Sequence, residues 1–345
     1  MKRLKVAIGL SGGVDSAVSA YLLKQQGYEV VGVHMKCWDS SEYECNADQD
    51  RADAVNVAAQ LGIKMEVLDF VKEYKSRVME YFYKEYELGR TPNPDIMCNK
   101  EIKFGLFLDW ALKNGFDKIA TGHYACVTET KGIFKLLKGA DGTKDQSYFL
   151  YLLGQEQLAK VIFPVGDLKK SEVRKVAKNQ NLAVSSKPDS MGICFVGEVN
   201  IKDFLKKKIK TASGNVVNET GEVIGKHDGL AFYTIGQRHG FKVEKYTGIP
   251  MYVIGKNTQN NELIVGFIKD VGKTSLVVSQ LHWIYKQPAD TFDCDVRIRN
   301  LGKLYPSTVD GGHVFFKEKV FGVAPGQSAV FYVGDEVIGG GIIEN

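Results

Sequence analysis

The fold of this 345-residue chain is decided by residues 4–16, LKVAIGLSGGVDS. Residues 4–10 form a short apolar run, which is typical of a buried parallel strand. Two glycines follow, and over residues 15–26 apolar side chains recur at helical spacing until Gly27 ends the pattern. A strand, a glycine loop and a helix in this order predict the first unit of an α/β fold.

The same alternation continues outward from this segment. Residues 30–35, 65–70 and 118–122 are strand-like, and residues 50–60 and 99–113 have helical periodicity. Strands that alternate with helices predict right-handed βαβ units and a doubly wound parallel sheet. Because ligands bind such sheets at the carboxyl ends of the strands, we expect the functional site beside the glycine loop.

Beyond about residue 200 the pattern changes to β signals. Residues 216–224 straddle an Asn-Glu-Thr-Gly turn, and residues 251–255 and 263–267 flank a polar turn as in a hairpin. After residue 274 short apolar runs alternate with Gly, Pro and Asn, which indicates an all-β module. We therefore predict an α/β domain over residues 1–200, a small central domain over 201–273 and a C-terminal β-barrel-like domain over 274–345.

The composition is that of an ordinary globular protein, with 44% hydrophobic and 25% charged residues. No apolar run approaches the roughly 20 residues of a membrane span, and the N-terminal segment lacks the cleavage site of a signal peptide. Six scattered cysteines argue against a disulfide framework and predict a reducing, cytoplasmic location. The net charge of +4 permits a polyanionic partner without identifying one.

The segment SGGVDS, residues 11–16, has the features of a phosphate-binding loop. Its glycines let consecutive backbone N–H groups converge on an anion at a helix N-terminus, and Ser11 and Ser16 add hydroxyl donors. Asp15 would repel phosphate, so its expected role is to hold Mg²⁺ or to cap the helix. The loop lacks the Gly-Lys-Ser/Thr ending of the Walker motif, and a plain glycine turn is the alternative.

Two cysteines have contexts that suggest chemistry. Cys98 follows the proline-containing stretch TPNPDIM at the predicted start of a helix, where the helix dipole and nearby lysines would stabilise its thiolate. Asp95 lies three residues earlier, close enough to act as a general acid or base. Cys194 follows a loop that contains Pro and Gly, and the residues alone leave a core position and a chemical role equally open.

The remaining cysteines have weaker contexts. Cys126 and Cys294 lie in strand-like runs, which favours packing in the core. Cys37 and Cys45 lie in a polar loop and have no assigned role. No pair has zinc-finger spacing, so the sequence predicts no metal site built from cysteines.

The loop and the segments that follow it resemble a known family. SGGVDS after a first strand resembles the signature of the pyrophosphatase-loop ATP enzymes, which split ATP between its α- and β-phosphates. Together with this loop, six further segments resemble the tRNA-specific 2-thiouridylases in the same order: TPNPDIMCNKEIKFG, ATGHYA, GTKDQSYFLY, KPDSMGICFVGE, YTIGQRHG and PGQSAVFY. The resemblance implies a pyrophosphatase-loop domain, a small middle domain and a C-terminal β-barrel-like domain. It also implies an enzyme that replaces the C2 oxygen of the wobble uridine of tRNA, position 34, with sulfur.

The resemblance implies a role for each matching residue. Cys194 would carry a persulfide received from a sulfur donor, either a cysteine desulfurase or a sulfur relay protein. Cys98 would cleave that persulfide and leave a Cys98–Cys194 disulfide, and Asp95 would handle the proton. ATP and Mg²⁺ are the implied cofactors, and the implied ATP-binding residues are Gly9, Leu10, Ser11, Gly12, Gly13, Val14, Asp15, Ser16, Met35 and Gly122. The implied tRNA contacts are Asn93, Pro94, Asp95, His123, Lys144, Asp145, Gln146, Arg297, Ile298, Arg299 and Gln327.

Several alternatives stay open at this stage. His123 can equally be a satisfied histidine at a strand end, and Arg297 and Arg299, which would share one face of a strand, can form salt bridges across the sheet. Free sulfide can leave before attack, or the persulfide can attack directly. The chain can also be a small-molecule ligase of the same loop class, a tRNA-binding protein without catalysis, or an iron–sulfur-dependent tRNA thiolase. For the last of these, Asp95 stands where a further cysteine would be needed, although Cys37 and Cys45 keep it open.

Overall fold

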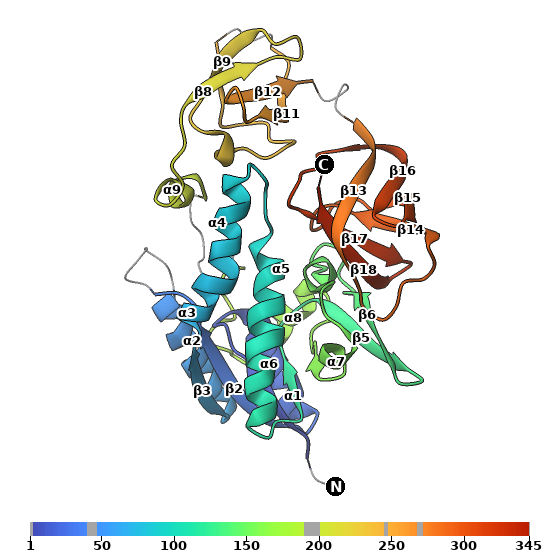
Figure 1. Ribbon diagram of the computed structural model, residues 1–345. Helices are drawn as coiled ribbons and strands as arrows, with labels where there is room; N and C mark the ends of the chain where they lie inside the picture. Colours follow the sequence, from blue (N-terminus) through green and yellow to red (C-terminus); the bar gives the residue numbers. More distant parts are fainter. Residues whose placement is uncertain (1–2, 40–46, 190–200, 245–247, 268–271, 345) are drawn as a thin grey trace.

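The computed structural model describes residues 3–39, 47–189, 201–244, 248–267 and 272–344. Its elements fall into three parts: an α/β part that contains the N-terminus, a small β part at the top of the view, and a β-barrel on the right (Figure 1). No helix in these ranges is both long enough and apolar enough to cross a membrane.

The α/β part is built on a parallel sheet with the strand order β3-β2-β1-β4-β7. Its strands are β1 (Lys5–Gly9), β2 (Glu29–Lys36), β3 (Lys64–Asp69), β4 (Lys118–Ala120) and β7 (Val161–Ile162). The order reverses at β1, which lies between β2 and β4, so the glycine loop after β1 lies at the switch point where such sheets bind ligands. The predicted doubly wound parallel sheet is confirmed, although β7 is too short to show a periodicity in the sequence.

Helices cover both faces of this sheet, which is why the central strand β1 is buried from Val6 to Gly9. Val6 and Ile8 of β1 pack on one side with α1 (Val14–Gln25), α2 (Ala47–Leu61) and α8 (Lys170–Asn179). Ala7 points to the opposite side, because successive strand residues alternate between faces. The helices on that side are α3 (Val71–Tyr74), η1 (Lys75–Met79), α4 (Glu80–Glu87), α5 (Pro94–Cys98), η2 (Asn99–Leu106) and α6 (Phe107–Lys113).

The helix predicted over residues 99–113 begins five residues earlier. α5, the π-helix η2 and α6 follow one another without a break from Pro94 to Lys113 (Figure 1). Asn93 caps the helix by accepting a hydrogen bond from the backbone N–H of Ile96 at 3.3 Å, and Pro94 occupies the first position, where its missing N–H costs nothing. The prediction of a loop up to Cys98 was therefore wrong, because Asn-Pro starts this helix.

A hairpin that the sequence analysis did not predict links the α/β part to the barrel. It consists of β5 (Ala125–Thr130) and β6 (Ile133–Lys138), joined by a turn at Lys131 and Gly132, which both have positive φ. β6 pairs with the last strand of the chain, and Figure 1 shows the hairpin lying against the barrel. The short helices η3 (Ser147–Leu150) and α7 (Gln155–Leu158) follow it.

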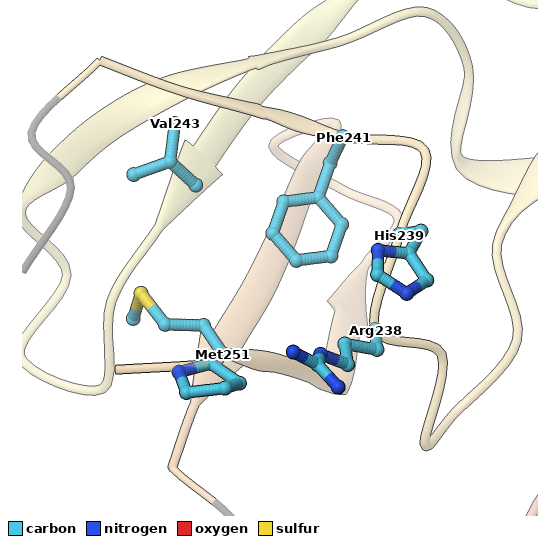
Figure 2. A pocket seen from close by; sticks show the side chains of 6 residues that line it. Arg238, His239, Phe241, Val243 and Met251 are labelled. Atoms are coloured by element: carbon cyan, nitrogen blue, oxygen red, sulfur yellow. The ribbon is translucent and has the colours of Figure 1, made fainter. Parts of the chain in front are cut away.

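The middle part is a sheet with the order β10-β9-β8-β12-β11. Its elements are α9 (Ile201–Lys206), β8 (Gly214–Val217), β9 (Val223–His227), η4 (Leu230–Phe232), β10 (Lys242–Val243), β11 (Tyr252–Asn257) and β12 (Glu262–Gly266). Both predicted hairpins are present as antiparallel pairs, β8 with β9 and β11 with β12. This part also holds a cavity of about 230 Å³, which Figure 2 shows between Phe241, Val243 and Met251 with Arg238 and His239 beside it.

The C-terminal strands close into a barrel. They are β13 (Gly272–Trp283), β14 (Thr291–Arg297), β15 (Tyr305–Asp310), β16 (His313–Phe321), β17 (Ser328–Val333) and β18 (Glu336–Ile343). Their order is β13-β16-β15-β14-β17-β18, and β13 also pairs with β18, which completes the ring. The β-barrel-like C-terminal part is confirmed, and Cys294 lies buried in β14 as predicted. The division at residues 200 and 273 stays a prediction.

Candidate active site

The glycine loop closes around the N-terminus of α1. The hydroxyl of Ser16 donates a hydrogen bond to the carbonyl oxygen of Gly13 at 3.0 Å, and the backbone N–H of Ser11 donates to that hydroxyl at 3.2 Å. Gly13 is the N-cap of α1 and provides no side-chain cap, so no side chain from the cap position covers the first N–H groups of this 12-residue helix. The loop has the geometry of an anion site at a helix N-terminus.

The ATP-binding residues implied by the resemblance meet around this loop. A Cβ at Gly122, just after β4, would lie 2.8 Å from the backbone nitrogen of Ser16, so Gly122 touches the loop. A Cβ at Gly9 would lie 3.1 Å from the side chain of Met35, which is near the end of β2. Three neighbouring parallel strands therefore bring their carboxyl ends to one place, as the sheet topology requires.

Replacing Gly12 by alanine is expected to abolish ATP binding. Gly12 has a φ of +77°, and a Cβ there would overlap the backbone carbonyl of Asp50 in α2, so the loop would have to open. Gly27 provides the matched control, because its φ of +85° imposes the same backbone strain while no atom lies within 4 Å of a Cβ. Calorimetric titration with ATP should show no binding to Gly12→Ala and normal affinity for Gly27→Ala. Equal ATP affinity of both variants would contradict a phosphate site at this loop.

Asp15 does not cap the helix. Both of its carboxylate oxygens accept hydrogen bonds from the ammonium group of Lys170, at 2.6 and 2.8 Å, and one also accepts from the hydroxyl of Tyr124 at 2.7 Å. Burial and the adjacent carboxylate raise the pKa of Tyr124 above its ordinary value, so its hydroxyl stays protonated and donates. Sequence reasoning missed both partners, which come from distant segments.

Asp15 also fits one ligand position of a magnesium ion. Its carboxylate already binds a cationic group, the Lys170 ammonium, which shows that the position accepts positive charge. Within the described ranges no three His, Cys, Asp or Glu side chains are grouped as metal ligands. The remaining ligands of an Mg²⁺ ion bound here would therefore be phosphate oxygens and water, which this ion commonly uses.

A second carboxylate, Asp189, gathers three cations beside Asp15. Its oxygens lie 2.7 Å from Lys144, 2.9 Å from Lys170 and 2.5 Å from Arg174. Although partial burial opposes it, these hydrogen bonds hold the pKa of Asp189 well below its ordinary value. Lys144, which the resemblance implies as a tRNA contact, is thus paired with Asp189 in this structure.

The structure describes one of the two cysteines that the sequence assigns to chemistry. Cys98 is fully buried and belongs to the same hydrophobic cluster as Met35 and Tyr148. It is the fifth residue of a continuous helix, so the expected position at a helix start was wrong. Asp95 lies one turn earlier in this helix, half-buried. Cys194 lies outside the described residues.

The structure describes three of the four other cysteines. Cys37 lies directly after β2, in the predicted loop, and its side chain is buried there. The adjoining Trp38 is buried in the same cluster, which explains why the segment folds inward. Cys126 lies in β5 and is half-buried. Cys45 lies outside the described residues.

Segments from all three parts converge just before the helix that carries Cys98. The side-chain amide of Gln327 donates to the carbonyl oxygens of Thr91 and Pro92 at 2.8 and 3.1 Å. The backbone N–H of Thr91 donates to the carbonyl oxygen of Pro325 at 2.8 Å. From the middle part, the Lys256 ammonium donates to the carbonyl oxygen of Gly89 at 2.8 Å. The barrel and the middle part therefore both hold the segment that leads into Asn93, Pro94 and Asp95.

His123 lies buried directly after β4. Its Nδ1 lies 2.7 Å from the hydroxyl of Thr121, and its ring packs against Phe104 and Phe163. Burial, reinforced by the charge of Lys103, lowers the pKa of His123 well below its ordinary value, so the ring is neutral. This environment matches the alternative of a satisfied histidine, and its contact with tRNA stays a prediction.

The remaining implied tRNA contacts are mostly engaged within the protein. Asp145 and Arg297 form a buried ion pair at 2.7 Å between the α/β part and the barrel, which is the salt-bridge alternative for Arg297. Arg297 ends β14 and is buried, whereas Arg299 lies beyond the strand and is exposed, so the expectation that the two share a strand face was wrong. Gln146 accepts a hydrogen bond from the backbone N–H of Tyr124 at 3.0 Å, and Ile298 is buried. Their contact with tRNA stays a prediction.

Comparison with known proteins covers nearly the whole chain. Residues 4–198 match the family described as tRNA methyl transferase HUP domain, residues 202–267 the tRNA methyl transferase PRC-barrel domain, and residues 273–343 the aminomethyltransferase beta-barrel domain. The tRNA-specific 2-thiouridylase MnmA of Exiguobacterium sibiricum is 48% identical, with 99% of this chain and 94% of the relative covered. The namesake protein of Enterococcus faecalis is 47% identical, with 99% and 96% covered.

This chain belongs to the tRNA-specific 2-thiouridylase family. Membership of the 2-thiouridylase family confirms the resemblance seen in the sequence, and with it the predicted class of a sulfur-transferring enzyme. Among solved structures, the U34-tRNA thiolase NcsA from Methanococcus maripaludis with its 4Fe-4S cluster aligns with 59% of this chain and 63% of its own length. At 18% identity and a TM-score of 0.38, that likeness is too distant to carry an inference.

Proposed function

We propose that this chain catalyses the ATP-dependent 2-thiolation of the wobble uridine, position 34, of tRNA in the cytoplasm. The observation that carries the proposal is the match over 99% of the chain to proteins named tRNA-specific 2-thiouridylase. The geometry supports it, because the anion site of the SGGVDS loop lies at the edge of the sheet where such folds bind ligands.

The first step is adenylation of the uridine. A C2 carbonyl oxygen is a poor leaving group, so it must first be converted into a good one. The uridine oxygen attacks the α-phosphorus of ATP, the bond between the α-phosphorus and the bridging oxygen breaks, and pyrophosphate leaves with the electron pair. The loop N–H groups and the α1 N-terminus bind the phosphates, and Asp15 would hold an Mg²⁺ ion, which supplies positive charge to the departing pyrophosphate.

The second step is transfer of sulfur. A donor protein loads Cys194 with a persulfide, whose terminal sulfur attacks C2 of the uridine and displaces AMP. The Cys98 thiolate then attacks the sulfur of Cys194, the sulfur–sulfur bond to the nucleotide breaks, and 2-thiouridine leaves with that electron pair. A Cys98–Cys194 disulfide remains, and an external thiol reduces it for the next cycle.

Cys98 has to turn out of the core for this step. Its thiol is fully buried here, and the π-helix η2 begins at the next residue. π-helical turns are rare and are frequently found at functional sites. Gly105 suits such a turn, since a Cβ there would lie 2.9 Å from the carbonyl oxygen of Lys100, five residues earlier. We propose that loss of this wide turn rotates Cys98 out of the core and exposes its thiol.

A reconstituted thiolation assay tests the proposal. The protein, ATP, Mg²⁺, a persulfide-loaded donor and unmodified tRNA are expected to yield 2-thiouridine, detected by mass spectrometry of the digested nucleosides. Omitting ATP should remove the product, since the oxygen at C2 is then not activated. A different result would contradict the proposal: ATP–pyrophosphate exchange that a small acid stimulates and that tRNA does not affect. That result would identify a small-molecule ligase.

A further inference from the structure

Lys170, the first residue of α8, reaches from a distant segment of the chain to the nucleotide loop. Its ammonium group lies 2.6 and 2.8 Å from the two oxygens of Asp15, in the first turn of α1, and 2.9 Å from Asp189. Only 12% of the side chain is exposed. One cation is therefore held between two carboxylates directly beside the anion site.

Neither carboxylate depends on Lys170 as its sole partner. Asp189 also accepts hydrogen bonds from Lys144 and Arg174, and Asp15 accepts one from Tyr124. Ordering a long lysine side chain in a nearly buried position costs rotamer entropy. A lysine at a helix N-terminus also opposes the helix dipole. The position points to a ligand that needs the ammonium group.

A bound triphosphate is such a ligand. It would place several negative charges next to Asp15, and like charges at that distance repel strongly unless a cation lies between them. The four-carbon stem of Lys170 lets the ammonium leave Asp15 for a phosphate oxygen while its bond to Asp189 remains. Tyr124 would then still hold Asp15 in place.

We propose that Lys170 contacts the β- and γ-phosphates of ATP and stabilises the departing pyrophosphate. The inference rests on the proposed function. In the adenylation step the bridging oxygen takes the electron pair of the broken bond, so negative charge grows on the pyrophosphate. The ammonium group stabilises that charge without transferring a proton, and Asp189 keeps the ammonium group oriented. Lys170 is thus a further substrate-contacting residue of the reaction.

Single-turnover release of pyrophosphate tests this role. With saturating ATP and unmodified tRNA, Lys170→Ala and the similarly sized Lys170→Met are expected to slow release by about 100-fold, the usual effect of removing one group that stabilises transition-state charge. ATP affinity, measured by calorimetric titration without tRNA, is expected to fall by about tenfold, because one phosphate contact is lost. Lys170→Arg, which keeps the charge, should recover most of the rate, and Lys169→Ala, the exposed neighbour, should match the wild type.

The outcomes separate this inference from the proposed function. If wild-type protein releases pyrophosphate on addition of tRNA and both Lys170→Ala and Lys170→Met do so at the same rate, the inference is wrong while the function stands. A loss of rate no greater than the loss of folded protein, measured by thermal unfolding, also overturns it. If wild-type protein releases none, the proposed function fails, and unchanged ATP affinity of Lys170→Ala would then refute the phosphate contact as well.

Discussion

Replacing Cys98 by serine will abolish 2-thiouridine formation while ATP binding stays at the wild-type level. A serine hydroxyl cannot attack the persulfide sulfur at neutral pH, because its pKa lies far above that of a thiol. The nucleotide loop follows β1, and Met35 in β2 and Gly122 after β4 lie beside it, so the phosphate contacts do not need the Cys98 side chain. Cys194→Ser should fail in the same way, since it cannot carry the persulfide. Nucleoside mass spectrometry and calorimetric ATP titration measure the two quantities.

Cys294→Ser is the matched control for this experiment. Cys294 is also a buried free cysteine, but it lies in β14 of the barrel, and burial raises the pKa of its thiol to about 12. A thiol in that environment is not a nucleophile, so the variant should still produce 2-thiouridine. If Cys98→Ser and Cys194→Ser both thiolate tRNA as Cys294→Ser does, the assigned sulfur chemistry is wrong.

Replacing Asp145 by asparagine will lower the free energy of unfolding by about 3–5 kcal/mol, the usual cost of leaving one partner of a buried ion pair uncompensated. Arg297 is 8% exposed and Asp145 is 1% exposed, so solvent cannot replace the lost carboxylate. Asp145 also accepts hydrogen bonds from the backbone N–H groups of Gly139 and Ser147, at 3.1 and 3.0 Å. Urea unfolding followed by tryptophan fluorescence measures the change.

Two further variants make the second prediction specific. Asp293→Asn removes one member of an exposed pair with Lys317 and should leave the unfolding midpoint unchanged. Replacing both Asp145 and Arg297 by apolar residues of similar size should restore much of the lost stability, because no unpaired charge is then buried. An Asp145→Asn protein that unfolds like the wild type would show that this pair does not hold the barrel to the α/β part.

Local patterns in the sequence predicted the sheet and the place of the site. The buried strands, the glycine loop and the helix after it each have a recognisable pattern within a short stretch of sequence. The topology of the fold then brings Met35 and Gly122 to the loop. The start of the helix at Pro94 was missed because a proline after asparagine suits both a loop and a helix N-terminus. Motif resemblance, and not periodicity, identified the tRNA and sulfur chemistry.

The contacts that complete the site could not be predicted in this way. Lys170 lies 155 residues from Asp15, and Arg297 lies 152 residues from Asp145. No local pattern connects such positions, because only the folded chain brings them together. The sole local hint was the unusual placement of lysines at the N-terminus of α8. The burial of Cys98 was equally hidden, since it depends on side chains from several helices.

The hairpin of β5 and β6 links the α/β part to a strand that follows it much later in the sequence. Lys135 in β6 forms an ion pair with Glu336 in β18 at 2.7 Å across a separation of 201 residues, and the backbones of the two strands pair there. Gln327, which supports the approach to Cys98, likewise follows its partner Thr91 by 236 residues. During translation, the α/β part therefore emerges from the ribosome long before it can acquire these supports. A nascent chain therefore reaches this geometry only after β18 has left the ribosome.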